Sequence, residues 1–412
     1  MHAPRHTDES SIRYHGWRVV LACFVMAVLV WGFGFYGHGF YLAELQRLHG
    51  WSAALISGAS TAYYLLSALL VVFVNDAIRR LGAAGCVVVG TLALAGAAAA
   101  LPFVREPWQL LAAYLVMALA WATMSLGAIN NILGLWFEEK RGLAISLALN
   151  GASFSGVVVV PALVLLAGVA DFRTAMLAGA ALIVAAMLPL AVTTLRAAPP
   201  YAPGRAAPAP AAADAAAGPW TRRSALASLA FWSVSGPFSL AITSQAGFLV
   251  HQIAFLEPSI GRYAAGIAVA VTTAMAIVGR LVLGALARRL DQRMASAVSL
   301  ASQAAALAVM TQATEVRTLL AACAVYGFSV GNVITFPSLI VQREFPAAAF
   351  GMIIGLSTGV SQLTYAFGPG LLGMVRDATG GYTAPLGLCI ALNLAAAAMV
   401  LHRPRAAMPA PS

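Results

Sequence analysis

The sequence predicts an all-α membrane protein with twelve transmembrane helices in two pseudo-symmetric six-helix bundles. Three observations support this fold class. First, hydrophobic residues make up 61% of the 412 residues and charged residues only 9%, whereas a soluble globular protein carries about 25% charged residues. Second, the apolar residues fall into twelve runs, and the mean hydropathy of the chain is +0.85. Third, the first six runs and the last six carry matching motifs.

Each apolar run is close to the twenty or so residues that a helix needs to cross a bilayer. The runs lie near residues 17–40, 52–75, 83–104, 108–131, 142–168, 174–195, 225–255, 263–287, 294–313, 317–340, 350–375 and 382–401. The gap between the sixth and seventh runs is rich in Pro and Ala, a composition typical of a linker. The expected organisation is an N-terminal tail, a first bundle, a linker, a second bundle and a C-terminal tail, at residues 1–16, 17–196, 197–222, 223–401 and 402–412.

The distribution of basic residues predicts the orientation. With the N-terminus inside, 17 of the 24 Lys and Arg residues fall in inner segments and 6 in outer loops, and the remaining one is Arg280. Cytoplasmic loops carry such an excess of positive charge. We therefore expect a multi-pass protein of the plasma (inner) membrane with both termini and the linker in the cytoplasm. No cleaved signal peptide is expected, because the first apolar run is too long for one.

The two halves repeat each other at a slowly drifting offset. Gly34, Phe35, His38 and Glu44 recur 213 residues later, at Gly247, Phe248, His251 and Glu257. Matches in later runs have offsets of 211, 209 and 208 residues. One match could arise by chance in a chain rich in Ala and Gly, but several in the same order indicate a parallel duplication of a six-helix unit.

Arg280 is the clearest candidate for function. It lies inside the eighth apolar run, where an Arg costs about 2.5–3.5 kcal/mol to insert and normally faces a wet cavity or a partner. The apolar runs contain no Asp or Glu except Asp76, at the inner end of the second run. The functional interpretation is that Arg280 binds a substrate carboxylate through its two-pronged guanidinium group. The alternative is an Arg that reaches the headgroups or caps a neighbouring helix.

Other polar residues in the runs are weaker candidates. His38 and His251 occupy equivalent positions and could sense pH, carry a proton or bind an anion, or they could simply lie near the headgroups. Further candidates for the substrate site are Tyr36, Asn130 and Tyr365, although most such residues in membrane bundles form interhelical hydrogen bonds.

Several other functions lack a sequence signal. The basic residues are scattered between apolar runs, a distribution that argues against nucleic-acid binding. No catalytic, nucleotide-binding or metal-binding motif is present, so we predict a protein that is not an enzyme and uses no cofactor. The four cysteines lie far apart in apolar stretches, as expected of small residues buried in helices.

The chain resembles the major facilitator superfamily, and within it the monocarboxylate and oxalate–formate antiporter branch. The resemblance covers residues 14–400 and rests on GWRVV at 16–20, WFEEKRGLAISLALNGASFSG at 136–156, and Gly279-Arg280-Leu281. It implies two six-helix bundles with a substrate site between them, and a carboxylate-binding role for Arg280. Two family features differ: Arg79 and Arg288 occupy the loop positions where Asp is usual. The candidate gating-loop residues are Asp76, Arg79, Arg80, Arg288 and Arg289.

Together these observations predict a monomeric carrier of a small organic anion, with a monocarboxylate as the expected class, that works by alternating access. Exchange, facilitated movement, and a symport in which substrate and a His share a proton all remain open. The alternatives are a carrier of drugs or neutral solutes on the same fold, and a membrane sensor with a transporter-like body.

Overall fold

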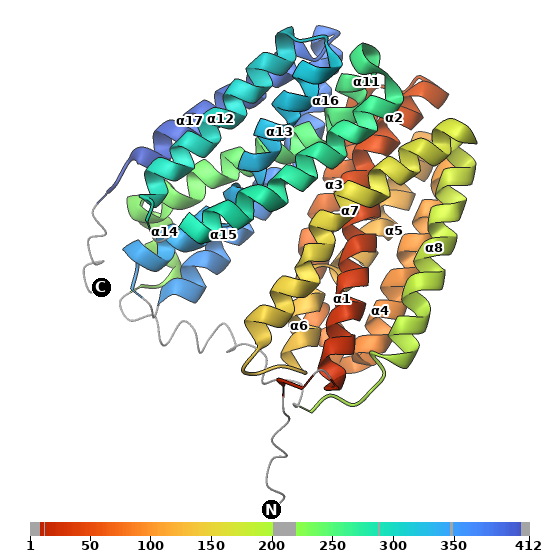
Figure 1. The fold of residues 1–412 in the computed structure, drawn as a ribbon, viewed down its shortest axis with the longest axis vertical. Coiled ribbons are helices and arrows are strands. Elements are labelled where there is room, and N and C mark those ends of the chain that lie inside the picture. The colour runs from red at the N-terminus through yellow and green to blue at the C-terminus, as the bar shows by residue number, and fades with distance from the viewer. Residues whose placement is uncertain (1–8, 12, 201–219, 287–288, 347–348, 405–412) are drawn as a thin grey trace, which may run out of the picture. The chain divides into compact units, whose positions relative to one another are not determined.

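The predicted fold class is confirmed by a computed structural model, which describes residues 9–11, 13–200, 220–286, 289–346 and 349–404. Within these ranges all regular structure is helical, and no strand occurs. Figure 1 shows the helices as long rods joined by short connections.

The described residues pack into two compact units. Unit 1 comprises Met1–His38 and Leu65–Ala207, and unit 2 comprises Gly39–Tyr64 and Pro208–Ser412. The boundary falls inside two helices, α2 (Gly37–His49) and α3 (Ala53–Val71). Contacts thus assign the segment Gly39–Tyr64 to unit 2, although it precedes the linker in sequence. The division into bundles at residues 17–196 and 223–401 stays a prediction.

Unit 1 is built from helices that overlap the predicted runs, although one of them, α4, begins nine residues before the run at 83–104. They are α1 (His15–Trp31), the π-helix η1 (Gly32–Tyr36), α4 (Val74–Ala100), the short 3₁₀ helix η2 (Leu101–Phe103), α5 (Pro107–Met124), α6 (Leu126–Gly134), α7 (Arg141–Val169) and α8 (Phe172–Thr193). Helix α1 packs on α7, and α4 packs on α5 and α8. At Gly151 a Cβ atom would collide with the carbonyl oxygen of Phe24, so the absence of a side chain allows α7 to approach α1 closely.

Unit 2 contains the helices after the linker together with most of α2 and the first part of α3, up to Tyr64. They are α10 (Arg222–Ala227), α11 (Leu229–Leu286), α12 (Gln292–Gln312), α13 (Val316–Val333), α14 (Phe336–Glu344), α15 (Phe350–Tyr365), α16 (Gly368–Thr379) and α17 (Thr383–Leu401). Helix α11 packs on α13, α15 and α17, and α12 packs on α13 and α17.

Glycines set the close approach of α11 and α13. A Cβ atom at Gly279 would collide with the carbonyl oxygen of Phe328. Cβ atoms at Gly327 and Gly331 would collide with the carbonyl oxygens of Thr272 and Ala276. Small residues at such contacts are typical of membrane helices, where close backbone packing replaces the hydrophobic effect as the driving force.

Among the residues that the structure describes, ten helical segments are long and apolar enough to cross a membrane. One of them, α11, has 58 residues, about twice the length of a single crossing. It changes direction at Gly261, whose φ of 77° is a conformation that favours glycine. Helices α15 and α16 are each too short to span and are separated by two residues. Helix α15 lies in the predicted run 350–375, and α16 begins in this run and ends four residues beyond it. Dividing α11 and joining these two gives the twelve predicted segments.

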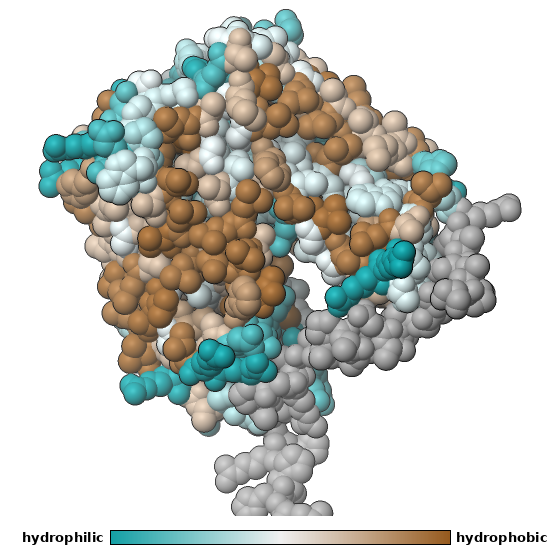
Figure 2. All heavy atoms as spheres, turned by 180° about the vertical axis from the view of Figure 1, so that it is seen from behind, coloured by the Kyte–Doolittle hydropathy of each residue, from teal (hydrophilic) through white to brown (hydrophobic). Residues whose placement is uncertain are grey.

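The exterior carries large apolar side chains. Val72, Trp108, Val169 and Leu229 are each at least two-thirds exposed. In Figure 2 brown hydrophobic residues form broad areas on the visible face, with white and tan residues between them, and the strongest teal residues gather in smaller groups, mainly at its margins. Such a surface is suited to lipid rather than to water.

Candidate functional site

In unit 1 the predicted residues Tyr36 and His38 lie at an irregular turn of the first membrane segment. Tyr36 is the last residue of the π-helix η1, and His38 follows in α2. Single π-helical turns inside α-helices occur frequently at functional sites. The His38 ring is fully buried and stacks on Tyr114 of α5, with a centroid distance of 4.7 Å and an interplanar angle of 11°.

Aromatic rings surround this turn. The rings of Trp31 and Trp121 are 4.9 Å apart, and Phe35 lies 6.2 Å from Trp121 and 5.0 Å from Tyr36. Trp121 and Tyr114 were not predicted as site residues. Both come from the fourth predicted run, where an aromatic residue among apolar neighbours carries no signal of its own.

Asn130 lies in α6 and is partly buried. Its Oδ1 atom is buried and has no hydrogen-bond partner among the described residues. The adjacent Asn131 instead donates from Nδ2 to the carbonyl oxygen of Gly127 in its own helix, at 2.9 Å. Asn130 therefore keeps an unused acceptor inside unit 1, the property expected of a residue that can bind a hydrogen-bond donor.

In unit 2 His251 is buried and both of its ring nitrogens have partners. Nε2 lies 3.1 Å from the carbonyl oxygen of Pro369, and Nδ1 lies 3.2 Å from the hydroxyl of Tyr382. A carbonyl oxygen only accepts, so Nε2 must carry the proton, and in the neutral ring Nδ1 accepts from Tyr382. His251 thus links α11 to α16 and α17.

Tyr365, at the end of α15, packs edge-to-face against Tyr64 with ring centroids 5.2 Å apart. Tyr64 also lies 4.9 Å from Tyr63. The structure therefore brings this predicted residue to α3 within unit 2. The predicted residues His251 and Arg280 lie on a different helix, α11.

Arg280 lies within the continuous second part of α11 and is partly buried. It precedes the end of the helix at Leu286 by six residues, about 9 Å along the axis. Its neighbour Gly279 is the residue that contacts the backbone of α13. Arg280 is therefore held next to a close helix contact that limits how α11 can rotate.

The predicted gating residues Asp76, Arg79 and Arg80 do not lie in a loop but at the start of α4, before the break in this helix at Gly82. Asp76 and Arg79 form an ion pair, with half of each side chain exposed. Arg80 and Arg289 are also exposed, and Arg288 lies outside the described residues. An exposed pair of this kind contributes little to stability, about 0–1 kcal/mol.

Unit 2 contains an ionic group that the sequence does not predict. Glu44 of α2 is 2% exposed and pairs with both Arg262 of α11 and Arg47. The sequence shows an acid in each outer loop, but not which Arg it meets 218 residues later. Also in unit 2, the carboxylate of Asp377 accepts hydrogen bonds from the backbone N–H groups at the start of α3.

Arg293 differs from its predicted environment. It counts as a loop residue in the charge distribution, yet it is 2% exposed. Its Nε and Nη2 atoms each donate to the Glu344 carboxylate at 2.7 Å, and Nη1 donates to the carbonyl oxygens of Val400 and His402. It therefore connects α12, α14 and the end of α17.

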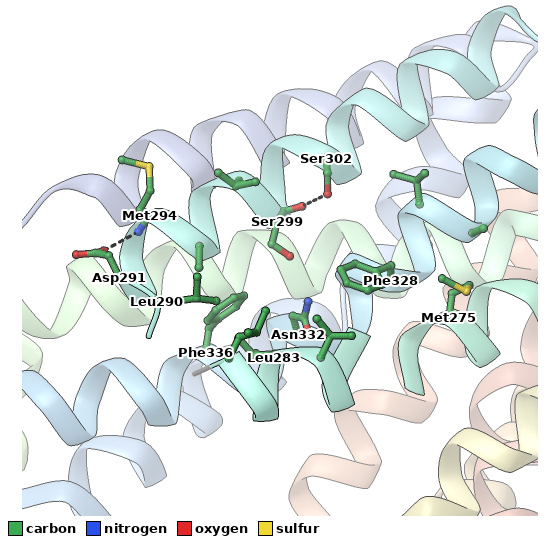
Figure 3. Close-up of a pocket in the computed structure, with 16 residues that line it drawn as sticks. Met275, Leu283, Leu290, Asp291, Met294, Ser299, Ser302, Phe328, Asn332 and Phe336 are labelled. Carbon is green, nitrogen blue, oxygen red and sulfur yellow. Dashed lines mark hydrogen bonds between the residues drawn. The ribbon is translucent and has the colours of Figure 1, made fainter. Parts of the chain in front are cut away.

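A cavity of about 660 Å³ lies among α11, α12, α13 and the start of α14, all in unit 2 (Figure 3). Its walls are mostly apolar, and it is separate from the predicted site residues. No group of three or more potential metal ligands occurs among the described residues, and all four cysteines are buried thiols.

The comparisons with known proteins agree with this architecture. The family model of the Major Facilitator Superfamily matches residues 22–369. Two solved structures of a bacterial homologue of the human lysosomal transporter Spinster are similar in fold. The inward-facing, occupied form has a TM-score of 0.69 at 15% identity, and the inward-facing, unoccupied form has 0.68 at 14%. In both cases 95% of each chain is covered.

No match was found among curated protein sequences. The solved structures are too distant in sequence to indicate more than a shared fold. The family model, in contrast, covers most of the chain, including every predicted site residue up to Tyr365. The chain therefore belongs to the major facilitator superfamily of membrane transporters.

Proposed function

We propose that this transporter carries a small organic anion, of the monocarboxylate class, by alternating access. Arg280 is the residue that binds the carboxylate. The observation that carries the proposal is the position of Arg280, partly buried inside a membrane-spanning helix. An ionisable residue within the membrane is by default a candidate for the substrate pathway.

The chemistry of Arg280 favours an anion. A guanidinium group presents parallel N–H donors that match the two oxygens of a carboxylate, and it remains charged at all relevant pH values. The other charged residues of α11, Glu257 and Arg262, flank the break at Gly261 and so lie near a helix end. Arg280 is six residues from the nearer end, which distinguishes it from these two.

Uptake into liposomes containing the purified protein tests this proposal. We expect accumulation of one or more monocarboxylates, and about tenfold or greater loss of uptake in Arg280→Gln, since a hydrogen bond to a charged group contributes about 1.5–3 kcal/mol. Arg280→Lys should still attract the carboxylate but lose the two parallel hydrogen bonds to it. Its uptake should therefore lie between those of the wild type and Arg280→Gln. Arg317→Gln, which removes an exposed charge at the start of α13, is the matched control.

The solute panel also separates the proposal from the other carrier function. Equal monocarboxylate uptake by wild type and Arg280→Gln would show that Arg280 is not the anchor. Uptake confined to neutral or cationic solutes would indicate a drug or neutral-solute carrier instead. Running the assay with a proton gradient, and with internal anion, distinguishes symport from exchange.

The proposal includes a plasma-membrane location with both termini in the cytoplasm, supported by the excess of basic residues in the predicted inner segments. Fusing a reporter that folds only in the cytoplasm to either terminus tests this orientation. Light scattering of the purified protein tests the expectation of a monomer.

A further inference from the structure

The cavity shown in Figure 3 is a second feature with the properties of a binding site. Its volume of about 660 Å³ lies within the range of about 300–1,000 Å³ that is typical of ligand pockets. Leu283 of α11, Val298 of α12 and Phe328 of α13 line it, together with Phe336 of α14. All of these residues lie in unit 2, so the cavity does not depend on unit 1.

The cavity opens on the apolar exterior of the unit. Several residues that line it are large, hydrophobic and exposed: Val298 is 62% exposed, Met294 54% and Val325 49%. In a protein whose helices cross a membrane, such side chains face lipid chains. An acyl chain can therefore enter from the side, without passing through water.

The length of the cavity matches one leaflet. Along α11 its lining extends from Met275 to Leu286, a rise of about 16 Å at 1.5 Å per residue. Half of the hydrocarbon core of a bilayer is about 15 Å thick. The cavity therefore runs from the end of α11 to about the depth of the midplane.

Three arginines bond to, or directly precede, residues that line one end of this cavity. Leu290 and Asp291 line that end. The carbonyl oxygen of Leu290 accepts a hydrogen bond from Arg343 at 3.2 Å, and the Asp291 carboxylate pairs with Arg403 at 2.5 Å. Arg289, next to Leu290, is exposed. This basic rim (Arg289, Arg343 and Arg403) has three positive charges against the one negative charge of Asp291.

A polar group also reaches the cavity wall. Asn332 is 6% exposed and lines the cavity, and its Oδ1 atom has no hydrogen-bond partner among the described residues. A side-chain amide offers both a donor and an acceptor. The cavity therefore combines an apolar channel, one buried amide and a basic rim.

We propose that this cavity binds an anionic phospholipid of the leaflet at the Arg-rich end of the unit. One acyl chain fills the channel, the amide of Asn332 meets the polar glycerol region, and the phosphate lies at the basic rim. Attraction of Lys and Arg for anionic lipid at a membrane surface contributes about 1 kcal/mol per residue, and the charge excess at the rim supplies it. This site is distinct from Arg280, so it holds or fails independently of the proposed function.

Photocrosslinking tests the site directly. The full-length protein is placed in phosphatidylcholine vesicles that contain a little phosphatidylglycerol with a diazirine in its acyl chain. Adducts are mapped by mass spectrometry. We expect them to concentrate in residues 275–302 and 324–336. Arg289→Gln and Arg343→Gln should each reduce labelling about fivefold, whereas Arg317→Gln should not. Ala295→Trp fills the cavity and should abolish labelling, and Ala308→Trp, on the same helix but outside the cavity, should not.

Competition identifies the occupant. Unlabelled phosphatidylglycerol should displace the probe, while phosphatidylcholine with the same chains and glycerol phosphate alone should do so poorly. Adducts spread evenly over the lipid-facing helices, or unaffected by both rim substitutions, would overturn the proposal. Equal displacement by phosphatidylcholine would show an apolar groove without charge selection. The rim variants leave the packed core unchanged, so the test stands even if Ala295→Trp fails to fold.

Discussion

The carboxylate of Asp377, in α16, accepts a 2.6 Å hydrogen bond from the backbone N–H of Ala54, at the start of α3. The N–H of Ala53 donates to the other carboxylate oxygen at 3.2 Å. A residue 323 positions away in sequence thus caps a helix whose own first turn leaves N–H groups without partners. Further along α3, the hydroxyl oxygen of Thr61 accepts a 3.2 Å hydrogen bond from the backbone N–H of Gly370. These contacts fasten the segment Gly39–Tyr64 to the rest of unit 2.

Removing this cap should loosen α3. Asp377→Ala leaves two N–H groups without acceptors and is expected to cost about 1 kcal/mol, as for other helix caps. Ser57 is buried where α3 meets Gly373, so a cysteine at this position reports separation of the two helices. In a background without the native cysteines, maleimide labelling of Ser57→Cys should rise about fivefold when Asp377→Ala is added.

The control is Asp377→Asn, which keeps one acceptor oxygen and should give an intermediate rate. If labelling stays the same in all three proteins, Asp377 does not hold α3 in place.

The same carboxylate also leads to a prediction about pH. Burial raises the pKa of Asp377, but hydrogen bonds from Ala54, Arg376, Ser52 and Ala53 outweigh this effect, so the pKa is lowered from its ordinary 3.8. Because the pKa is lowered, the Asp377 carboxylate is charged and caps α3 at any pH above its ordinary pKa. The cap is lost only when the pH falls below that ordinary pKa and the carboxylate is protonated. Maleimide labelling of Ser57→Cys should therefore be independent of pH between about 5 and 8 once the reagent's own pH dependence is subtracted. A fall in protection near pH 6 would assign the cap to another group.

Replacing the buried Glu44 should cost more stability than replacing its partner Arg262. Glu44 faces two guanidinium groups, those of Arg47 and Arg262. Glu44→Gln removes the carboxylate that both pair with and leaves only the nearby Glu257 as counter-charge. Arg262→Gln, in contrast, leaves Glu44 paired with Arg47. We expect about 1–3 kcal/mol for Glu44→Gln, because the carboxylate is buried but both Arg side chains are partly exposed.

A double-mutant cycle with Arg262→Gln measures the coupling through chemical unfolding of the purified carrier. The cost of Arg262→Gln should be smaller than that of Glu44→Gln. Costs that simply add in the double mutant would mean that the two side chains do not interact. Equal single costs would mean that the pairing of Glu44 with Arg47 contributes nothing.

The sequence predicts the helices well but not how they are interrupted or paired. Hydropathy shows that residues 350–375 are apolar, but it does not predict that this run divides into α15 and α16. Similarly, the first run continues through a π-helix to His49, and two polar residues of this extension, His38 and Glu44, are buried rather than exposed. Arg293 shows the limit of a charge count, which assigns residues to sides of a membrane but is blind to burial. Glu44 and Arg262, and likewise Asp377 and Ala54, lie more than 200 residues apart, and only the tertiary fold brings them together.

The contacts of His251 predict a structural role that can be separated from transport. Tyr382→Phe removes the partner of Nδ1 and should cost about 1 kcal/mol. His251→Leu also leaves the Pro369 carbonyl oxygen without its donor and should cost about 1–3 kcal/mol. His251→Gln can still donate to Pro369 and should recover part of the loss. Unfolding gives these energies, and liposome uptake gives the transport constants. An unchanged stability together with an altered KM in His251→Leu would instead assign His251 to the substrate.

The packing of α11 against α13 predicts that alanine substitutions at two glycines have opposite effects on stability. Gly331→Ala places a Cβ atom against the carbonyl oxygen of Ala276, and overpacking of this kind costs about 1–3 kcal/mol. Gly284, in α11 itself, has no atom within 4 Å of where its Cβ would lie. There Gly284→Ala should be neutral or stabilising by about 0.5–1 kcal/mol, because alanine loses less conformational freedom in a helix.

Thermal unfolding of both variants measures the difference. Because Arg280 follows the contact residue Gly279, Gly331→Ala should also reduce uptake, while Gly284→Ala should leave it intact. Equal stability of the two variants would show that α11 and α13 do not meet through their glycines.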